Sequence, residues 1–374
     1  MLKVAIVTPL GSFPFRRIAD EIAKVFAAHG WFTVVHHSDW PMFFKRYDRI
    51  VFINLTHSIA YGAARTMRVF NTKDLILYFV SESDKMHVDV RTANRVEKLV
   101  RRVATPSMFS FECMREQGLR VDDVVPHGFD SEYWCSEPSY AKEVREKFKG
   151  KRILFTNVAN SRRKCIDKLF DVLARLLKHG IKDWVLLINT PPLGHYNVPK
   201  LIDDLSKYWG VELNKHIINV WEGKMRGGTP IDKIKAYYYA AHVYVQPSCN
   251  EGFGMPIVEA MLCKKPIVYV DAPPMNEIAS PDFGYPVKYS EMKYDRMSYR
   301  TAIMFIPDMD DYYKVMEKVL TVDEDELIRR GIKARDRGRL YDYRRVYRYF
   351  VNPPEPDDRP KAYDIFRGVM VDVL

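Results

Sequence analysis

Two glutamates that flank a glycine-containing loop offer the clearest chemistry in this chain. Glu251 and Glu259 lie on either side of Gly252-Phe253-Gly254-Met255-Pro256. Glycine lets backbone N–H groups approach a ligand closely, and proline is tolerated at the start of a helix. We therefore expect a ligand-binding turn with Glu251 in the loop and Glu259 in the first helical turns, both able to accept hydrogen bonds from a polyol. Taken alone, acidic residues at a helix start also suit the helix dipole.

The spacing of the two glutamates bears on whether they could act as an acid and base pair. If most of the interval is helical, the carboxylates lie roughly 10–12 Å apart. Hydrolytic carboxylate pairs require about 5–9.5 Å. The spacing therefore favours binding roles for Glu251 and Glu259 over acid/base roles.

A basic cluster, Arg162-Arg163-Lys164, forms the second chemical feature. It follows a strand pattern at residues 153–155 and precedes a helix pattern at residues 166–177. Arginine, lysine and a helix N-terminus can stabilise the charge of a departing diphosphate where water is excluded. Which of Arg162 and Arg163 takes this role stays open, and a solvated basic helix start is the alternative.

Alternating strand and helix patterns surround both features. Strand-like runs at residues 243–245 and 267–270 make the glycine loop part of a β-α-β unit, and turns at the carboxyl end of a parallel strand bind ligands. Further strand patterns at residues 3–7, 32–36, 50–54 and 75–80 alternate with helices in the first half. This alternation predicts parallel sheets with helices on both faces.

The length of 374 residues and the 47% apolar content suffice for two domains. We place an N-terminal domain at residues 1–148 and a C-terminal domain at residues 149–350. Residues 131–149 are polar and irregular, as expected of a connection between domains. A last segment, residues 351–374, is expected to pack back on the N-terminal domain.

The ordered motif around the glycine loop resembles the signature of retaining glycosyltransferases of family four. The matching positions are Pro247-Ser248, Glu251, Gly252-Phe253-Gly254, Pro256, Glu259-Ala260-Met261, Pro266-Ile267-Val268 and Glu277. Arg163-Lys164 matches the family's Arg-Lys-Gly except that Cys165 replaces glycine. Lys264 stands where a glycine commonly ends the helix, so we expect a different helix C-cap there.

This resemblance implies an α/β GT-B fold, with two Rossmann-like parallel-sheet domains facing across a cleft. It further implies transfer of a hexose from a UDP- or GDP-sugar, with retention of anomeric configuration and without a metal ion or other cofactor. The C-terminal domain would bind the donor and the N-terminal domain a sugar, glycan or lipid-linked acceptor. The alternative is a non-catalytic module of the same fold that binds a nucleotide sugar or a polyanion.

The family resemblance also assigns roles to individual residues. Glu251, Arg163, Lys164 and His57 would be catalytic. Donor-binding residues would be Arg162, Gly252, Phe253, Gly254, Met255, Pro256 and Glu259. On the acceptor side would lie Gly11 and Ser12, which replaces the family's second glycine. Glu82 is placed there as well, because it ends another strand at the same rim.

Charge and cysteine content suggest where the protein works. The net charge of +10 is spread along the chain, so nucleic acid is not the expected partner. Arg91, Arg95, Lys98 and Arg102 recur at helical spacing and would allow peripheral contact with an anionic membrane, although a solvated helix face explains them as well. The five scattered cysteines show no metal or redox spacing, which predicts a reducing, cytoplasmic location.

Two further patterns receive structural interpretations. Asp308-Met309-Asp310-Asp311 mimics a metal-binding Asp-x-Asp motif, but its position before a helix pattern favours an N-cap. The basic, tyrosine-containing stretch from Arg335 to Arg348 has the composition of a nucleic-acid patch. We expect it to form terminal helices instead.

Overall fold

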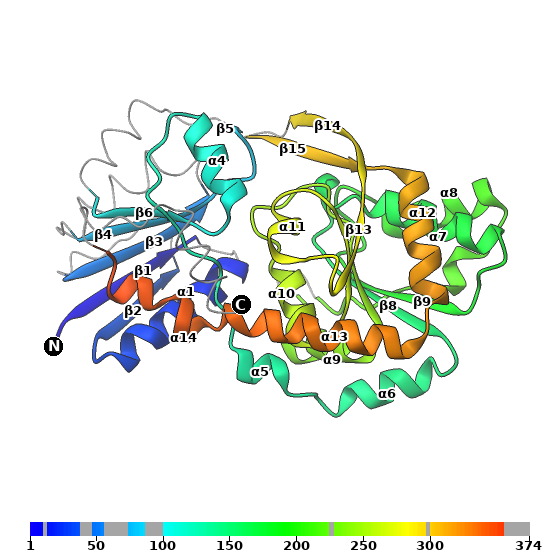
Figure 1. Ribbon diagram of the computed structural model, residues 1–374, viewed down its shortest axis with the longest axis horizontal. Helices are drawn as coiled ribbons and strands as arrows, with labels where there is room; N and C mark the ends of the chain where they lie inside the picture. The colour runs from blue at the N-terminus through cyan, green and yellow to red at the C-terminus, as the bar shows by residue number, and fades with distance from the viewer. Residues whose placement is uncertain are drawn as a thin grey trace. The chain divides into compact units, whose positions relative to one another are not determined.

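A computed structural model of the chain describes residues 1–9, 13–37, 47–55, 74–86, 100–223, 228–296 and 300–354. These residues form two compact units (Figure 1). The first unit contains Met1–Asp130, Tyr294–Ile303 and Leu340–Leu374, and the second contains Ser131–Lys293 and Met304–Arg339. The chain therefore passes from one unit to the other more than once.

The first unit is built on a parallel sheet of six strands in the order β2-β1-β3-β4-β6-β7. The strands are β1 (Lys3–Thr8), β2 (Phe32–His37), β3 (Arg49–Leu55), β4 (Leu75–Val80), β6 (Arg102–Thr105) and β7 (Asp123–Val124). The predicted strands of the first half are all present. The apolar runs of β1, β3, β4 and β6 are buried, as expected where helices cover a parallel sheet, whereas β2 is partly exposed.

The second unit has its own parallel sheet, in the order β10-β9-β8-β11-β12-β13. The strands are β8 (Arg152–Asn157), β9 (Trp184–Asn189), β10 (Ile217–Asn219), β11 (Val243–Gln246), β12 (Ile267–Val270) and β13 (Gly284–Val287). Relative to the chain, this is the doubly wound order 3-2-1-4-5-6. The direction of winding reverses between β8 and β11, and ligands bind in such folds at that switch point.

Helices complete both units (Figure 1). They are α1 (Phe13–Ala28), α4 (Met108–Glu116), α5 (Ser131–Cys135), α6 (Tyr140–Lys147), α7 (Ile166–Lys178), α8 (Val198–Trp209), α9 (Ile231–Ala240), α10 (Met255–Leu262), α11 (Met275–Ile278), α12 (Met309–Thr321), α13 (Glu324–Gly338), α14 (Tyr343–Val346) and α15 (Arg348–Val351). In the second unit, α7 packs with α8 and α12, and α10 packs with α13. The helix predicted at residues 166–177 is confirmed as α7, whose apolar stripe is buried.

A small third sheet has the order β14-β15-β5, with strands β14 (Tyr289–Arg296), β15 (Arg300–Pro307) and β5 (Lys85–Met86). Strand β15 runs antiparallel to β5. Asp308 caps α12 by accepting hydrogen bonds from the backbone N–H groups of Asp310 and Asp311, which confirms the predicted N-cap.

The units do not follow the predicted limits at residues 148 and 350. Residues 131–147 are not an irregular connection, because they form α5 and α6 of the second unit. Trp134 explains the difference: it is only 1% exposed, and its carbonyl accepts a hydrogen bond from the Tyr239 hydroxyl. A single buried aromatic side chain can anchor a polar segment that shows little apolar periodicity.

The basic stretch from Arg335 to Arg348 forms the end of α13 and the short helix α14, as predicted. Two of its three tyrosines belong to the core, since Tyr341 and Tyr347 are 2% and 0% exposed, while Tyr343 is partly exposed. From Leu340 onward the described chain packs in the first unit. There the Arg49 guanidinium donates to the carbonyl groups of Phe350 and Val351.

The predicted membrane-facing stripe is wrong at Arg102, the one member that the structure describes. Arg102 lies in strand β6, not on a helix, and is 1% exposed. Its guanidinium donates to the Pro354 carbonyl and lies 3.6 Å from the Asp123 carboxylate, so it ties down the end of the described chain. The other members, Arg91, Arg95 and Lys98, lie outside the described residues.

We predicted a different helix C-cap at Lys264, and this prediction is wrong, because the backbone there has the geometry that a glycine would adopt. Lys264 itself takes the left-handed conformation, with φ at 58°. Its carbonyl lies so close to Gly331 of α13 that a Cβ there would approach it to 2.2 Å. Close packing of α13 against the end of α10 therefore holds Lys264 in a conformation that costs a side-chain-bearing residue about 1 kcal/mol.

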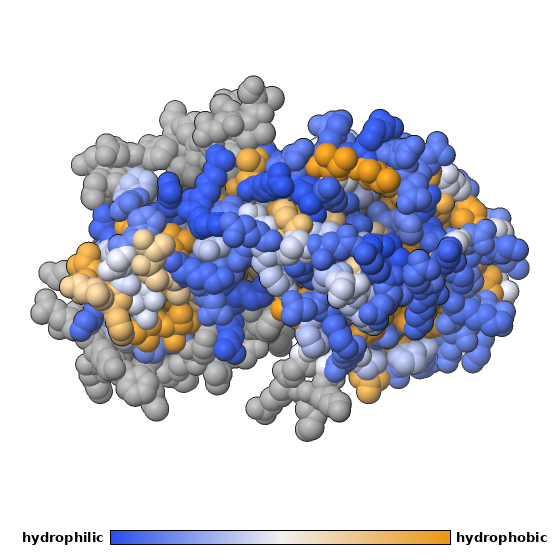
Figure 2. Space-filling view, turned by 90° about the horizontal axis from the view of Figure 1, so that it is seen from below, coloured by the Kyte–Doolittle hydropathy of each residue, from blue (hydrophilic) through white to orange (hydrophobic). Residues whose placement is uncertain are grey.

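The visible surface of the second unit is mostly hydrophilic (Figure 2). In Figure 2, hydrophilic residues cover most of its visible face, and apolar residues form small separate patches. Its most exposed large apolar side chains among the described residues are Tyr208, Leu193, Met292 and Ile328. Among the described residues, no helix has the length and apolar character needed to cross a membrane.

Candidate active site

The two predicted chemical segments follow the two strands that border the switch point of the second sheet. Strand β8 ends at Asn157 and leads to Arg163 and Lys164, while β11 ends at Gln246 and leads to Glu251. Because β8 and β11 pair directly, through Phe155 and Tyr244, their carboxyl-end loops are neighbours. Sheet order therefore brings together side chains that are 87 residues apart in sequence.

Glu251 receives both cations of the basic cluster. The Lys164 ammonium pairs with Glu251 Oε1, and Arg163 Nη1 lies 3.1 Å from Oε2. Arg163 Nη1 also donates to the Asn250 carbonyl at 2.8 Å. Lys164 and Glu251 are each 6% exposed, so this is a buried cluster of two positive charges and one negative charge. A site with one net positive charge in a low-dielectric setting favours an anionic ligand.

The pKa of the Glu251 carboxyl records this arrangement. Burial alone would raise the pKa, but the charges of Lys164 and Arg163 outweigh it and hold the pKa at about 2, below the ordinary 4.5. The carboxyl is therefore ionised throughout the neutral range. Its ion pairs persist down to strongly acidic solution.

This depressed pKa predicts a pH dependence of stability. The contribution of ionised Glu251 is complete above pH 4.5 and is lost as the pH falls toward 2. Between about pH 6 and about pH 3, we expect wild type to lose about 2 kcal/mol more unfolding free energy than Glu251→Gln, in which this group cannot titrate. Urea titrations of both proteins across this range measure the difference. Equal losses would contradict the assignment of the low pKa.

A buried relay holds the Glu251 carboxylate from its other side. Gln246 Nε2 donates to Glu251 Oε1 and to Ser248 Oγ, each at 2.7 Å. Gln246 Oε1 in turn accepts a hydrogen bond from the Tyr244 hydroxyl. The sequence interpretation assigned Gln246 no role, because a glutamine at a strand end carries no chemical signal until its neighbours are known.

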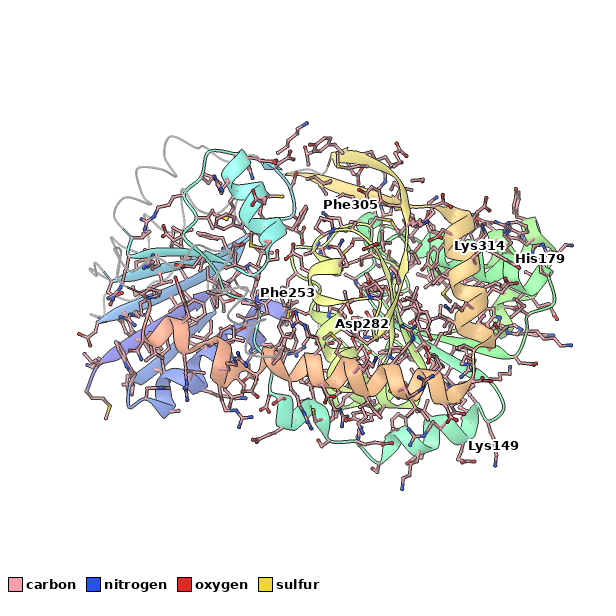
Figure 3. All side chains as sticks on the ribbon, in the orientation of Figure 1. Lys149, His179, Phe253, Asp282, Phe305 and Lys314 are labelled. Carbon is pink, nitrogen blue, oxygen red and sulfur yellow. A yellow bond between two sulfur atoms is a disulfide. The ribbon has the colours of Figure 1, made fainter. Side chains whose placement is uncertain are left out.

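The glycine loop leads into α10 as predicted. Gly254 is the N-cap residue, with φ at 106°, a conformation that L side chains rarely adopt. Met255 and Pro256 are the first two residues of the helix. Gly252 is buried in the loop, and Phe253, labelled in Figure 3, is 4% exposed. The need for glycine is thus clearest at position 254.

Glu259 occupies a buried position on α10. It is 3% exposed, and its Oε2 accepts a hydrogen bond of 2.9 Å from the Tyr238 hydroxyl of α9. Tyr238 was not singled out from the sequence, because it lies in an unremarkable run of three tyrosines. The structure therefore presents Glu259 within a hydrogen-bonded interior and not on an open surface.

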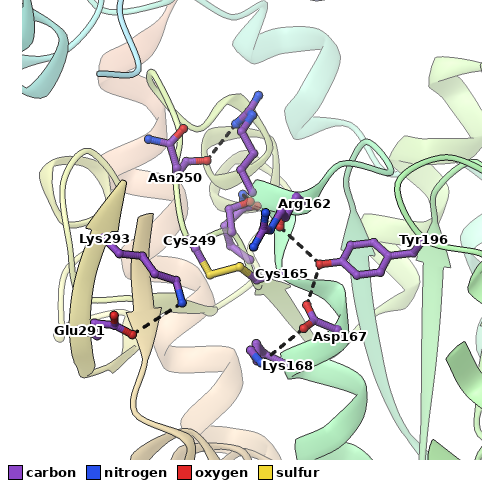
Figure 4. Close-up of a disulfide and its surroundings, with 12 residues drawn as sticks. Arg162, Cys165, Asp167, Lys168, Tyr196, Cys249, Asn250, Glu291 and Lys293 are labelled. Atoms are coloured by element: carbon purple, nitrogen blue, oxygen red, sulfur yellow. Dashed lines mark hydrogen bonds and ion pairs between the residues drawn. A yellow bond between two sulfur atoms is a disulfide. The ribbon is translucent and has the colours of Figure 1, made fainter. Parts of the chain in front are cut away.

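A disulfide bond joins the two loops beside this cluster (Figure 4). It links Cys165, next to Lys164, with Cys249, two residues before Glu251, across a sequence separation of 84. Cysteine spacing could not reveal a pair so distant in sequence. The predicted reducing location rested on cysteines that show no pairing. This bond removes that basis, because structural disulfides are typical of oxidising compartments.

Of the remaining predicted site residues, the structure describes Glu82 and Arg162. Glu82 lies in the first unit, after β4, and is 5% exposed. Arg162 is next to Arg163 in a short 3₁₀ turn, where its carbonyl accepts from the Tyr196 hydroxyl. Gly11, Ser12 and His57 lie outside the described residues. Within the described ranges, no group of three or more histidine, cysteine, aspartate or glutamate side chains could hold a metal ion.

Comparison with known families identifies the segment that carries this cluster. Residues 140–294 match the family of glycosyl transferases group 1. The match covers less than half of the chain, but it includes Arg163, Lys164, Glu251 and the helix α10. A glycosyltransferase uncharacterized in function, number 335 of Sulfolobus islandicus rod-shaped virus 1, is 26% identical over 120 residues. That alignment spans 32% of this chain and 35% of the viral protein.

Solved structures agree over nearly the whole chain. HepE from Anabaena, in complex with UDP and glucose, superimposes with a TM-score of 0.68 at 15% identity and covers 94% of this chain and 98% of its own. Sucrose-phosphate synthase from Thermosynechococcus elongatus gives 0.68 at 16% identity over 100% of both chains. A glycosyltransferase from Rickettsia africae gives 0.71 at 15% identity over 99% of this chain and 98% of its own.

These similarities confirm the predicted GT-B fold class, with two α/β units that each contain a six-stranded parallel sheet. At such low identity the solved structures show the fold alone. The similarity to glycosyltransferases therefore rests on the family match over residues 140–294.

Proposed function

We propose that the protein transfers a hexose from a nucleotide-diphosphate sugar to an acceptor, with retention of anomeric configuration. The convergence of Arg163 and Lys164 on Glu251 at the switch point of the second sheet carries this proposal. The cluster lies in the segment that matches glycosyl transferases group 1. The complexes of HepE with UDP and with UDP-glucose support a UDP-sugar as donor, with a GDP-sugar as the alternative.

In this proposal Arg163 and Lys164 stabilise the diphosphate as it leaves the sugar. The two cations are already held in place by Glu251 and the Asn250 carbonyl, so little reorganisation is needed when negative charge develops. Each preorganised donor of this kind contributes about 3 kcal/mol to stabilising a transition state. Charge compensation by these side chains needs no metal ion, which is our proposal for the cofactor requirement.

Glu251 and the loop after it would position the sugar. The carboxylate would accept hydrogen bonds from sugar hydroxyls, the backbone amides of Phe253 and Gly254 would lie against the sugar, and Glu259 would hold the ribose. Met255 and Pro256 start the helix whose N-terminus faces the donor in this scheme. On the acceptor side we propose Glu82, with Gly11, Ser12 and His57.

The proposal is tested with a panel of UDP- and GDP-sugars. Release of UDP or GDP from one cognate donor, dependent on a sugar or glycan acceptor, is the expected result. The anomeric configuration of the product, read from proton NMR coupling constants, decides retention. Tight binding without release would identify a non-catalytic nucleotide-sugar module instead, and absence of both would contradict the proposal.

The two arginines of the cluster should differ in effect. Arg163→Ala removes the guanidinium that contacts Glu251 and the Asn250 carbonyl, so we expect kcat/KM for the donor to fall roughly 100-fold. The matched variant Arg162→Ala should lower it by less than about tenfold, because Arg163 and Lys164 remain. Steady-state kinetics of both variants provide the measurement. If kcat/KM fell more in Arg162→Ala than in Arg163→Ala, the diphosphate role would belong to Arg162.

A further inference from the structure

One departure from the family pattern, Cys165, takes part in a disulfide bond. Cys165 stands where the resembling family has glycine after Arg-Lys, and it takes a left-handed conformation with φ at 46°. Such a conformation favours glycine, so a cysteine there requires some other reason. Its partner, Cys249, lies on the glutamate-bearing loop. The bond therefore accounts for a residue type that the local backbone does not favour.

The bond connects the two loops at the point where their side chains meet. Cys165 directly follows Lys164, and the Cα atoms of Cys165 and Cys249 are 6.0 Å apart. The Cys249 N–H donates to the Arg163 carbonyl at 2.9 Å, so a backbone hydrogen bond lies beside the covalent link. Both cysteines are buried. Figure 4 shows the bond between them, with Arg162 and Asn250 nearby.

Each loop is also anchored on its own side. Asn160 Nδ2 donates to the carbonyl groups of Pro191 and Tyr196, which holds the basic loop against the segment after β9. Gln246, at the end of β11, holds Glu251 on the other loop. These anchors act on the loops separately, whereas the disulfide fixes the distance between them.

We propose that the Cys165–Cys249 disulfide is a positioning element of the diphosphate site, which holds Arg163 and Lys164 at a fixed distance from Glu251. The identity of the ligand rests on the proposed function. A dithiol that reduces the bond is itself oxidised to a cyclic disulfide: the Cys165–Cys249 sulfur–sulfur bond breaks, and both cysteines gain a hydrogen as thiols. The reduced protein is expected to bind the diphosphate more weakly.

The first experiment asks whether the bond forms in the full-length protein. Proteolysis without reduction, after alkylation of free thiols, should yield a peptide pair linked through Cys165 and Cys249. Reduction by dithiothreitol before alkylation should separate the pair. Fully alkylated Cys165 and Cys249 in the unreduced protein would overturn the proposal.

Variants then separate positioning from simple stabilisation. The double variant Cys165→Ser/Cys249→Ser removes the bond. The double variant Cys165→Gly/Cys249→Ser also removes it, but places at position 165 the residue that suits a left-handed turn. The control is Cys135→Ser, which changes a cysteine outside the bond. For both bond-free variants we expect Kd for UDP or GDP, measured by calorimetry well below the melting temperature, to rise roughly 10- to 100-fold. Donor KM should rise and kcat fall together, and Cys135→Ser should match wild type.

Hydrogen exchange supplies a readout that does not depend on any nucleotide. Amides in residues 158–165 and 247–254 should exchange faster in both bond-free variants, with the rest of the second unit unchanged. If Cys165→Gly/Cys249→Ser exchanges its amides and binds the nucleotide as wild type does, the proposal is overturned, because a glycine at position 165 would then be enough to hold the loop without the bond. If wild type binds neither UDP nor GDP, the proposed function fails, while the exchange data still decide whether the bond positions the loops.

Discussion

Glu251→Gln should abolish most sugar transfer while leaving the fold intact. We expect kcat/KM for the cognate donor to fall by roughly 10²- to 10³-fold, the range seen when one preorganised group of an active site is removed. Glutamine keeps the size of the side chain and its hydrogen bond with Gln246. It removes the charge that gathers Arg163 and Lys164.

Glutamine is a sharper replacement here than alanine. Alanine at position 251 would also remove transfer, but it would leave the buried Lys164 ammonium beside a void, and loss of activity could then reflect unfolding. The matched control is Glu291→Gln on β14, an exposed glutamate whose partner is Lys293. Circular dichroism and calorimetry should show both glutamine variants folded at the assay temperature. Turnover of Glu251→Gln within a few-fold of wild type would contradict the assigned role.

Lys164→Met should be the second most damaging change, with effects on both stability and activity. Methionine fills the space of the aliphatic stem but leaves the Glu251 carboxylate with Arg163 as its remaining paired cation. Breaking a buried ion pair by removing one partner costs about 3 kcal/mol. Because the same ammonium would meet the leaving diphosphate, we also expect kcat to fall about 10²-fold or more.

The control for Lys164→Met is Lys168→Met, four residues further along in α7. Lys168 is paired with Asp167 near the surface, where such a pair contributes less than about 1 kcal/mol. Urea denaturation and nucleotide-release kinetics measure the two effects. If both lysine variants lose the same small amount of stability and activity, Lys164 has no special place in the site.

Local pattern sufficed to predict the elements around the site. Strand β12 was predicted with its observed limits, Ile267–Val270, and α7 within a residue of its end, because apolar periodicity reports which face of an element is buried. The glycine loop was equally predictable, since Gly254 needs a backbone conformation that other residues avoid.

Prediction failed where a distant partner decides the environment. Arg102 continues a helical series of basic residues, yet it pairs with Asp123 and the Pro354 carbonyl inside the first unit. Residues 131–147 look like a polar connection, yet Trp134 draws them into the second unit. The contacts that decide these environments are distant in sequence: Arg102 contacts Asp123 and Pro354, and the Trp134 carbonyl accepts from the Tyr239 hydroxyl.

The sequence by itself determined the α/β class, the β-α-β unit of the glycine loop and the residue types available for binding a charged ligand, because periodicity and turn chemistry are local properties of the chain. Only the tertiary structure decided that Lys164 meets Glu251, that Glu259 is buried against Tyr238, and that Cys165 is bonded to Cys249. The physical reason is the order of strands in the second sheet. It places β8 beside β11, and no local feature of either strand encodes that pairing.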